Sequence, residues 1–146
     1  MTEASRTRDV AAGPAAVWAV LADFGSLSAW ADGVDHSCLL NDGATEVGLT
    51  RRVQSGRDTF VETITVFDPP QLLAYDIHGV PRGFAASNRW NLRAHGDRAT
   101  TVTLTSTVSM DSRLLRPVGE RVFAQQMTRR SEALLSSLAL TLGGRS

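Results

Sequence analysis

The stretch 51-RRVQSGRDTFVETITVFDPPQLLAYDI-77 carries the clearest structural signal in the sequence. On a strand through TFVETITVF the side chains alternate between two faces, and one face takes Phe60, Glu62, Ile64 and Val66. Apolar residues at every second position are typical of a face that packs on a core. Glu62 therefore needs a partner, because a buried carboxylate is costly unless it is paired.

Composition and charge limit the function classes. The chain has 146 residues, 42% hydrophobic and 21% charged, which suits one globular domain over residues 1–146. Basic and acidic residues number 15 each, and no block of like charge stands out. Nucleic acid is therefore disfavoured as a partner, and so is an anionic membrane surface.

Neither the first residues nor the cysteine content indicates export or membrane insertion. MTEASRTRDV lacks the apolar core of a signal peptide, and no stretch approaches the roughly 20 apolar residues that span a bilayer. The single Cys38 cannot form an internal disulfide and fits a reducing compartment. We expect a cytoplasmic protein that is a monomer or a homodimer.

The order of the periodic runs predicts an α+β fold. A short first strand near SRTRDVAA precedes two short helices, in GPAAVWAVLADF and SLSAWA. Turn signals such as Asp68-Pro69-Pro70 then separate six runs of strand length: VDHSCLL, VGLTRRV, TFVETITVF, QLLAYDI, AASNRWNLRA and ATTVTLTSTVSM. No crossover helix intervenes, so about seven strands should form an antiparallel sheet.

The closing segment, from about residue 111 to 142, predicts one long helix. Its apolar positions include Val122, Phe123 and Met127, but Gln126 and Arg130 fall near the same side. A helix packed on a dry core would not normally place polar residues there. A curved sheet that grips a long helix leaves a cavity between them, so this layout favours ligand binding.

Four segments carry a resemblance to a known superfamily: VWAVLADFGSLSAW, VGLTRRV, FVETITVFDPPQLLAYDI and the closing helix. Their order and spacing resemble the helix-grip (SRPBCC) superfamily. It includes START lipid-transfer domains, Bet v 1 allergens, plant abscisic-acid receptors and bacterial polyketide cyclase/dehydrase-like proteins. The resemblance covers nearly the whole chain and implies one domain with an internal pocket for a hydrophobic or amphipathic small molecule. It implies no particular reaction.

The resemblance also suggests a partner for Glu62. In the abscisic-acid receptors the arginine and glutamate of the matching motifs face the cavity, and VGLTRRV places Arg51 on the face of Leu49 and Val53. Arg51 and Glu62 pointing inward on adjacent strands would satisfy each other and offer polar contacts to a ligand. The alternative is a buried ion pair that fixes strand register and touches no ligand.

The same face assignment predicts further pocket residues. His36 shares a face with Val34 and Cys38 and could act as a general acid or base, although a strand or rim residue is the plainer interpretation. Trp90 is expected as cavity wall or as core, and the Tyr75 hydroxyl could reach the pocket. The predicted lining is Val34, His36, Arg51, Glu62, Ile64, Tyr75, Ile77, Asn88, Trp90, Phe123, Gln126 and Met127.

The segment GVPRGF, residues 79 to 84, directly follows a strand, as the pocket-gating loop does in the plant receptors. We expect either a mobile lid or an ordinary long turn there.

Several chemistries lack their motifs. No glycine-rich phosphate loop, paired cysteine or zinc-type histidine spacing occurs, so we expect no metal or nucleotide cofactor. A nucleophilic Cys38 beside His36 would lack a separate orienting acid.

Three functions remain. The leading hypothesis is binding of a hydrophobic or amphipathic small molecule, lipid or polyketide-like, in the cavity. The second is an aldol-type cyclase or dehydratase, in which Glu62 or His36 is the base and Arg51 or Tyr75 stabilises the enolate oxygen. Close pairing with Arg51 weakens this hypothesis, because an ion-paired carboxylate is a poorer base. The third is a ligand-free regulatory or toxin-like interaction protein, which a cavity packed with side chains would favour.

Overall fold

The computed structural model describes residues 2–41, 46–80, 84–96, 98–110 and 116–143, without the side chains of residues 116–118. The elements follow one another as β1 (Thr2–Val10), α1 (Pro14–Ala22), the 3-10 helix η1 (Phe24–Ala29), β2 (His36–Leu39), β3 (Thr50–Ser55), β4 (Asp58–Asp68), β5 (Leu72–His78), β6 (Phe84–Ala94), β7 (Thr100–Met110) and α2 (Arg116–Gly143). This order confirms the predicted α+β fold.

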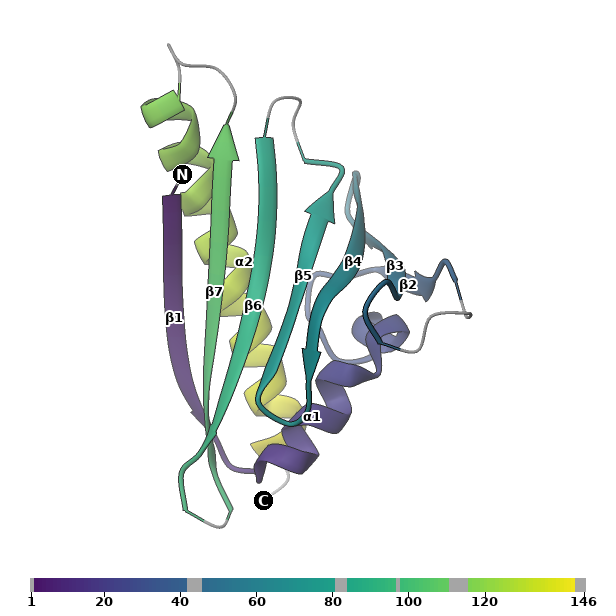
Figure 1. Ribbon diagram of the computed structural model, residues 1–146, viewed down its shortest axis with the longest axis vertical. Helices are drawn as coiled ribbons and strands as arrows, with labels where there is room; N and C mark the ends of the chain where they lie inside the picture. Colours follow the sequence, from purple (N-terminus) through teal and green to yellow (C-terminus); the bar gives the residue numbers. More distant parts are fainter. Residues whose placement is uncertain (1, 42–45, 81–83, 97, 111–115, 144–146) are drawn as a thin grey trace.

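The strands form one antiparallel sheet in the order β1-β7-β6-β5-β4-β3-β2. Every neighbouring pair except β1 and β7 is consecutive in the chain, as expected of a meander. Helix α2 runs along one face of the sheet and packs mainly against β1 and β7, while α1 lies near its C-terminal end and η1 packs against β2 and β3 (Figure 1). Within the described part of the chain, no helix is long and apolar enough to cross a bilayer.

Helix α2 is held by residues that recur every three or four positions. Phe123, Met127, Ser131, Leu135 and Leu138 are all buried, as a helix with one face on a core requires. Val122, which the sequence placed on the apolar side, is 54% exposed, so that part of the prediction is wrong. The buried face instead passes through Glu120, Phe123 and Met127.

A β-bulge in β4 changes which side chains face the core. Ile64 pairs with Tyr75, but Val66 pairs with Ala74, because the register shifts between Ile64 and Val66. An extra residue turns the following side chains to the opposite faces. Val66 is therefore 39% exposed, contrary to the alternation predicted from the sequence. Phe67 takes the inward place and packs edge-to-face on Trp18, with ring centroids 5.2 Å apart.

Candidate functional site

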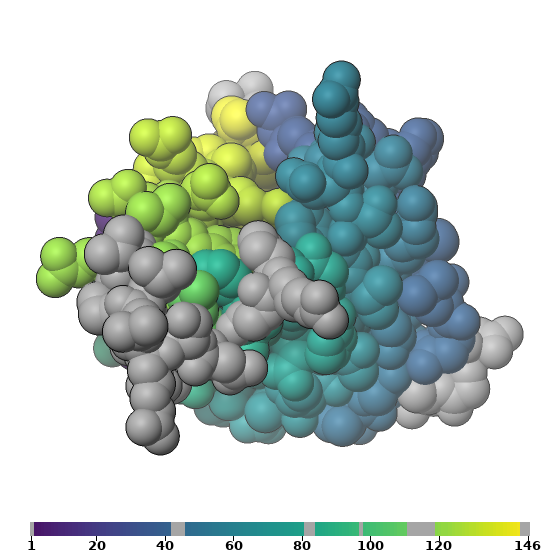
Figure 2. Space-filling view, turned by 90° about the horizontal axis from the view of Figure 1, so that it is seen from above, coloured from purple at the N-terminus to yellow at the C-terminus, as the bar shows by residue number. Residues whose placement is uncertain are grey.

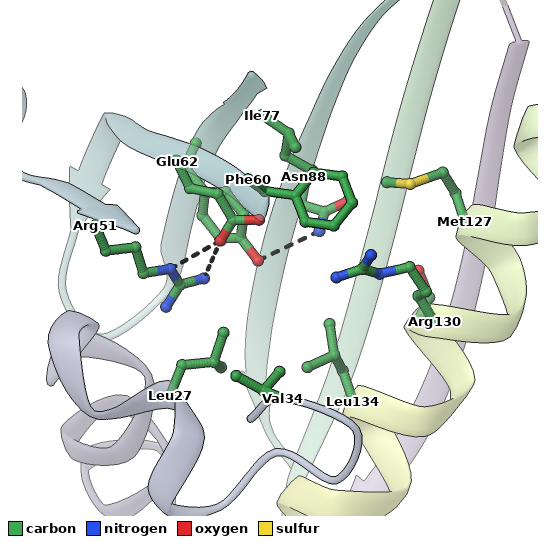
Figure 3. Close-up of a pocket in the computed structure, with 12 residues that line it drawn as sticks. Leu27, Val34, Arg51, Phe60, Glu62, Ile77, Asn88, Met127, Arg130 and Leu134 are labelled. Atoms are coloured by element: carbon green, nitrogen blue, oxygen red, sulfur yellow. Dashed lines mark hydrogen bonds and ion pairs between the residues drawn. The ribbon is translucent and has the colours of Figure 1, made fainter. Parts of the chain in front are cut away.

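A small chamber lies between the sheet and α2, inside the apolar core (Figure 3). Its walls come from η1, the segment before β2, strands β3 to β6, and α2. The lining residues are Leu27, Val34, Arg51, Phe60, Glu62, Tyr75, Ile77, Asn88, Met127, Arg130, Ser131 and Leu134. The chamber has a cavity volume of about 30 Å³. That volume holds about one or two water molecules.

Arg51 and Glu62 form a buried ion pair at one end of this chamber. They pair directly across β3 and β4, so both side chains leave the same face of the sheet. Arg51 Nε donates to Glu62 Oε1 at 2.8 Å, and Arg51 Nη2 lies 2.6 Å from the same oxygen. Arg51 is 4% exposed and Glu62 5%. The predicted inward pairing of these two residues is thus present in the structure.

The guanidinium of Arg51 is also fixed by aromatic neighbours. Its Nη1 donates to the carbonyl oxygen of Phe24 at 3.1 Å, and its Cζ lies 3.8 Å from the centroid of the Phe24 ring. The Tyr75 ring centroid is 4.9 Å away. These contacts hold the cation in place from η1 and β5, so the pair is rigidly oriented toward the chamber.

A buried hydrogen-bond chain connects α2 to the sheet. Ser106 Oγ donates to Asn88 Oδ1 at 2.6 Å and lies 3.0 Å from Ser131 Oγ. Because Ser106 has a single hydroxyl proton, which goes to Asn88, Ser131 must donate to Ser106. Asn88 Nδ2 and Trp90 Nε1 then both donate to the Tyr75 hydroxyl, each at 3.2 Å.

The Tyr75 hydroxyl can act only as a donor toward a ligand. It accepts two N–H groups, and its own O–H has no acceptor among the described residues. Tyr75 is buried, and burial raises the pKa of this phenol above 10.0; the nearby Glu62 carboxylate raises it further, while Arg51, Asn88 and Trp90 oppose the shift. The phenol therefore keeps its proton at neutral pH.

Glu62 offers the complementary acceptor. Both Arg51 contacts go to Oε1, and no hydrogen bond to Oε2 occurs within the described residues. Every fully buried side-chain nitrogen or oxygen of that part of the chain has a partner, so Oε2 is open to the chamber. A donor on Tyr75 and an acceptor on Glu62 thus line the same small space.

A stacked pair, Arg130 on Phe60, separates the chamber from the outside. Arg130 Cζ lies 4.4 Å from the Phe60 ring centroid. Both residues also line an open groove of about 490 Å³, here called the β4 groove, whose other residues are Asp58, Gly79, Phe123, Gln126, Met127 and Arg129. Figure 2 shows the molecule from above. Helix α2, in light green to yellow, lies on one side, and the strands coloured blue lie on the other.

A second groove, of about 230 Å³, shares Val34, Arg130 and Leu134 with the chamber. This loop groove is lined by Asp32, Gly33, Val34, Ser55, Arg129, Arg130, Ala133 and Leu134. Arg130 is the residue that the chamber and both grooves share.

The structure brings seven of the predicted pocket residues into the chamber wall: Val34, Arg51, Glu62, Tyr75, Ile77, Asn88 and Met127. Two others, Ile64 and Trp90, are buried in the core beside it. Phe123 and Gln126 line the β4 groove and not the chamber, contrary to the prediction.

His36 does not lie in the chamber wall, and this corrects the prediction. Ser37 pairs with the fully buried Val53, so Ser37 faces inward and its neighbours His36 and Cys38 face outward. His36 and Cys38 are both exposed. The predicted register of β2 was wrong by one residue, so His36 and Cys38 were placed on the inner face in place of Ser37.

Residues that the predicted lining omitted are Leu27, Phe60, Arg130, Ser131 and Leu134. Phe60 shares the face of Glu62, so the alternation of β4 was sufficient to find it. Arg130 was recognised as a polar residue on the apolar side of the helix, and that signal marks the chamber. Leu27 and Ser131 depend on how η1 and α2 pack, which strand periodicity does not report.

The segment 79 to 84, expected to be a mobile lid or an ordinary long turn, includes residues 81–83, which lie outside the described residues. At its start, Gly79 has a φ of +93°, and a Cβ there would come within 2.5 Å of the Thr59 carbonyl oxygen. Only glycine fits this approach to β4. In the described residues, no group of histidine, cysteine, aspartate and glutamate side chains could hold a metal ion.

Comparison with protein families gives one match that spans most of the chain. The model of the family described as polyketide cyclase/dehydrase and lipid transport matches residues 1–143. No curated protein matches the sequence significantly.

Solved structures share the fold at low sequence identity. The Zhui aromatase/cyclase from Streptomyces sp. R1128 is 19% identical, with a TM-score of 0.80 over 99% of this chain and 94% of that one. A START superfamily protein from Mycobacterium smegmatis is 13% identical, with a TM-score of 0.74 over 99% of both chains. Ara h 8.0201 is 12% identical, with a TM-score of 0.76 over 97% of both. The START and Bet v 1-like resemblance of the fold is confirmed.

Proposed function

The chain belongs to the polyketide cyclase/dehydrase and lipid transport family, and from this premise we propose that it binds a hydrophobic or amphipathic small molecule between the sheet and α2. One observation carries the proposal: an otherwise apolar core contains the buried Arg51–Glu62 pair beside a chamber. A buried ion pair is often less stabilising than apolar residues of the same size, so its presence here supports a role in recognition.

The polar end of the chamber orients the ligand. Tyr75 offers an O–H donor and Glu62 Oε2 an acceptor, which together match a hydroxyl or a hydroxyketone-like group. Apolar walls from Leu27, Ile77 and Leu134 take the adjoining carbon skeleton. Such a distribution, mostly apolar with a few fixed polar groups, is typical of small-molecule sites.

Binding requires the chamber to open. A volume of about 30 Å³ accepts water and no larger ligand. The Arg130–Phe60 stack therefore parts while the ligand enters, and the bound ligand extends into the β4 groove, where Phe123 and Met127 provide apolar contacts. The proposed binding takes place in the cytoplasm, which agrees with the free, exposed Cys38.

A second candidate function, an aldol-type cyclase or dehydratase, is favoured by the same two open groups. Glu62 Oε2 would take a proton from carbon, and the Tyr75 O–H would donate to the enolate oxygen that forms. Arg51 would hold the carboxylate in position. Turnover of a polyketide-like substrate that disappears in Glu62→Gln, with the fold intact, would establish this function over simple binding.

The small chamber is also what a ligand-free interaction protein would have, and native mass spectrometry separates the two. The purified protein is measured intact and again after denaturation. A small molecule that accompanies only the folded protein supports binding and identifies a ligand class. A protein that is empty and also fails to bind an added apolar fluorescent probe would favour the ligand-free function.

A further inference from the structure

The charged groups of the chamber do not cancel. Arg51 and Glu62 neutralise each other through contacts of 2.6 and 2.8 Å. The remaining charged residue of the wall, Arg130, forms no ion pair with any of the described residues. The chamber and its entrance therefore carry one uncompensated positive charge, in a half-buried position where charge interactions are stronger than in bulk water.

The contact that Arg130 does make leaves its donors free. Its guanidinium lies over the face of the Phe60 ring, with 4.4 Å between Cζ and the ring centroid. Stacking of this kind uses the flat face of the guanidinium, whereas the N–H groups point outward from its edge. No hydrogen bond from these N–H groups to a described residue occurs in the structure. Arg130 thus holds a set of unused donors at the entrance.

Acidic residues near the entrance do not supply the missing partner. Asp58 lines the β4 groove and Asp32 the loop groove, but neither lies within ion-pair distance of Arg130. Arg129 lines both grooves as well. Each groove therefore contains one carboxylate and two guanidinium groups, and its net charge is positive.

We propose that the ligand is an amphipathic acid, whose anionic oxygen group is bound by Arg130 at the chamber entrance. The inference rests on the proposed binding function and specifies the class of ligand. An arginine fork matches a carboxylate or a similar oxyanion through two parallel hydrogen bonds. The apolar part of the ligand lies against Phe60, Phe123 and Met127, which line the β4 groove.

Two fluorescent probes with the same aromatic skeleton test this inference. Anilinonaphthalene sulfonate carries one permanent negative charge that stands in for the acid, and N-phenylnaphthylamine carries none. Both are titrated into the wild type, Arg130→Gln and Arg121→Gln. Arg121 is the matched control, because it is an exposed arginine of the same helix that lines neither groove. Circular dichroism verifies that each variant is folded.

Arg130→Gln should weaken binding of the sulfonate probe about tenfold or more, because a charge-assisted hydrogen bond is lost. Binding of the neutral probe should change less than about threefold, and Arg121→Gln should have a similarly small effect on both probes. Equal weakening of both probes by Arg130→Gln would overturn the inference, since Arg130 would then act as an apolar wall. So would an equal effect of both arginines on the sulfonate probe.

The same titrations separate this inference from the proposed function. A further variant, Leu134→Trp, fills the chamber. If this variant loses binding of the neutral probe, while Arg130→Gln leaves the affinity for the sulfonate probe unchanged, the binding function is kept and the acid-binding role is rejected. Absence of binding by either probe to the wild type rejects both.

Discussion

Arg51 contacts Glu62 through two of its nitrogens, and both reach the same carboxylate oxygen, Oε1. The other oxygen, Oε2, is left toward the chamber. A pair that served only to neutralise charge would be expected to use both oxygens in the bidentate geometry that arginine and carboxylate prefer. The one-sided contact supports a second partner for Glu62, which we propose to be the ligand.

Removal of one member of the pair should destabilise the fold. Arg51→Met or Glu62→Leu should each lower the free energy of unfolding by about 3–5 kcal/mol, because an unpaired charge stays buried, and the double variant should recover most of this loss. Urea unfolding measures all three. A double variant that binds the apolar probe as the wild type does would assign the pair to register alone, whereas a weakened one supports ligand contact.

Tyr75 gives the stability of the protein a dependence on alkaline pH. Its pKa is raised above 10.0 in the fold, mainly by burial, so the folded chain keeps a proton that the unfolded chain releases. This contribution is fully present below pH 10.0 and is lost as the pH rises through the higher folded-state pKa. The free energy of unfolding should therefore fall above pH 10.0 in the wild type and fall less in Tyr75→Phe.

The composition of the chain allows the pH dependence of unfolding above pH 10.0 to be assigned to Tyr75. Tyr75 is the only tyrosine, and the chain contains no lysine. Unfolding by urea at a series of pH values in a Cys38→Ser background, which removes the only thiol, isolates the phenol. An identical pH dependence in Tyr75→Phe would contradict the assignment, as would tyrosinate absorbance that appears at the pH expected of a free phenol.

The bulge in β4 predicts opposite effects for two adjacent residues. Phe67→Ala should cost about 2–4 kcal/mol, because the ring packs on Trp18 in the core. Val66→Ala should cost less than about 1 kcal/mol, because the side chain faces solvent. Thermal or urea unfolding compares the two directly. The reverse order of stability would restore the uninterrupted alternation expected from the sequence.

The stack of Arg130 on Phe60 should limit the rate at which a ligand enters. Phe60→Ala removes the ring and should raise the association rate constant of N-phenylnaphthylamine several-fold, measured by stopped-flow fluorescence. Val66→Ala, an exposed position on the same strand, serves as the control. Slower or unchanged association in Phe60→Ala would mean that the ligand enters by another route, such as the loop groove.

Much of the fold follows from local periodicity. Alternation through TFVETITVF placed Phe60, Glu62 and Ile64 on the inner face, whereas the pairing of Arg51 with Glu62 was suggested by the family resemblance. These strands are long enough for their pattern to define the register. The long helix was equally visible, because its apolar positions recur over many turns.

The errors lie where the local pattern is short or interrupted. Strand β2 has four residues, and its register depends on Ser37 bonding to the carbonyl oxygen of Gly25, a contact between distant segments. A one-residue error there placed His36 inside. The bulge after Ile64 leaves no distinct residue pattern. The volume of the chamber depends on side chains such as Arg130 and Phe60 that meet from α2 and β4, which no single segment encodes.

Ligand binding in the chamber is tested most directly by filling it. Leu134 lines the chamber, whereas Leu140 lies on the same helix and is 71% exposed, so Leu134→Trp and Leu140→Trp make a matched pair. Each folded variant is titrated with N-phenylnaphthylamine beside the wild type. We predict saturable binding to the wild type and Leu140→Trp, and affinity at least about tenfold weaker in Leu134→Trp. Equal affinity in all three proteins, or no binding to the wild type, would contradict a ligand site between the sheet and α2.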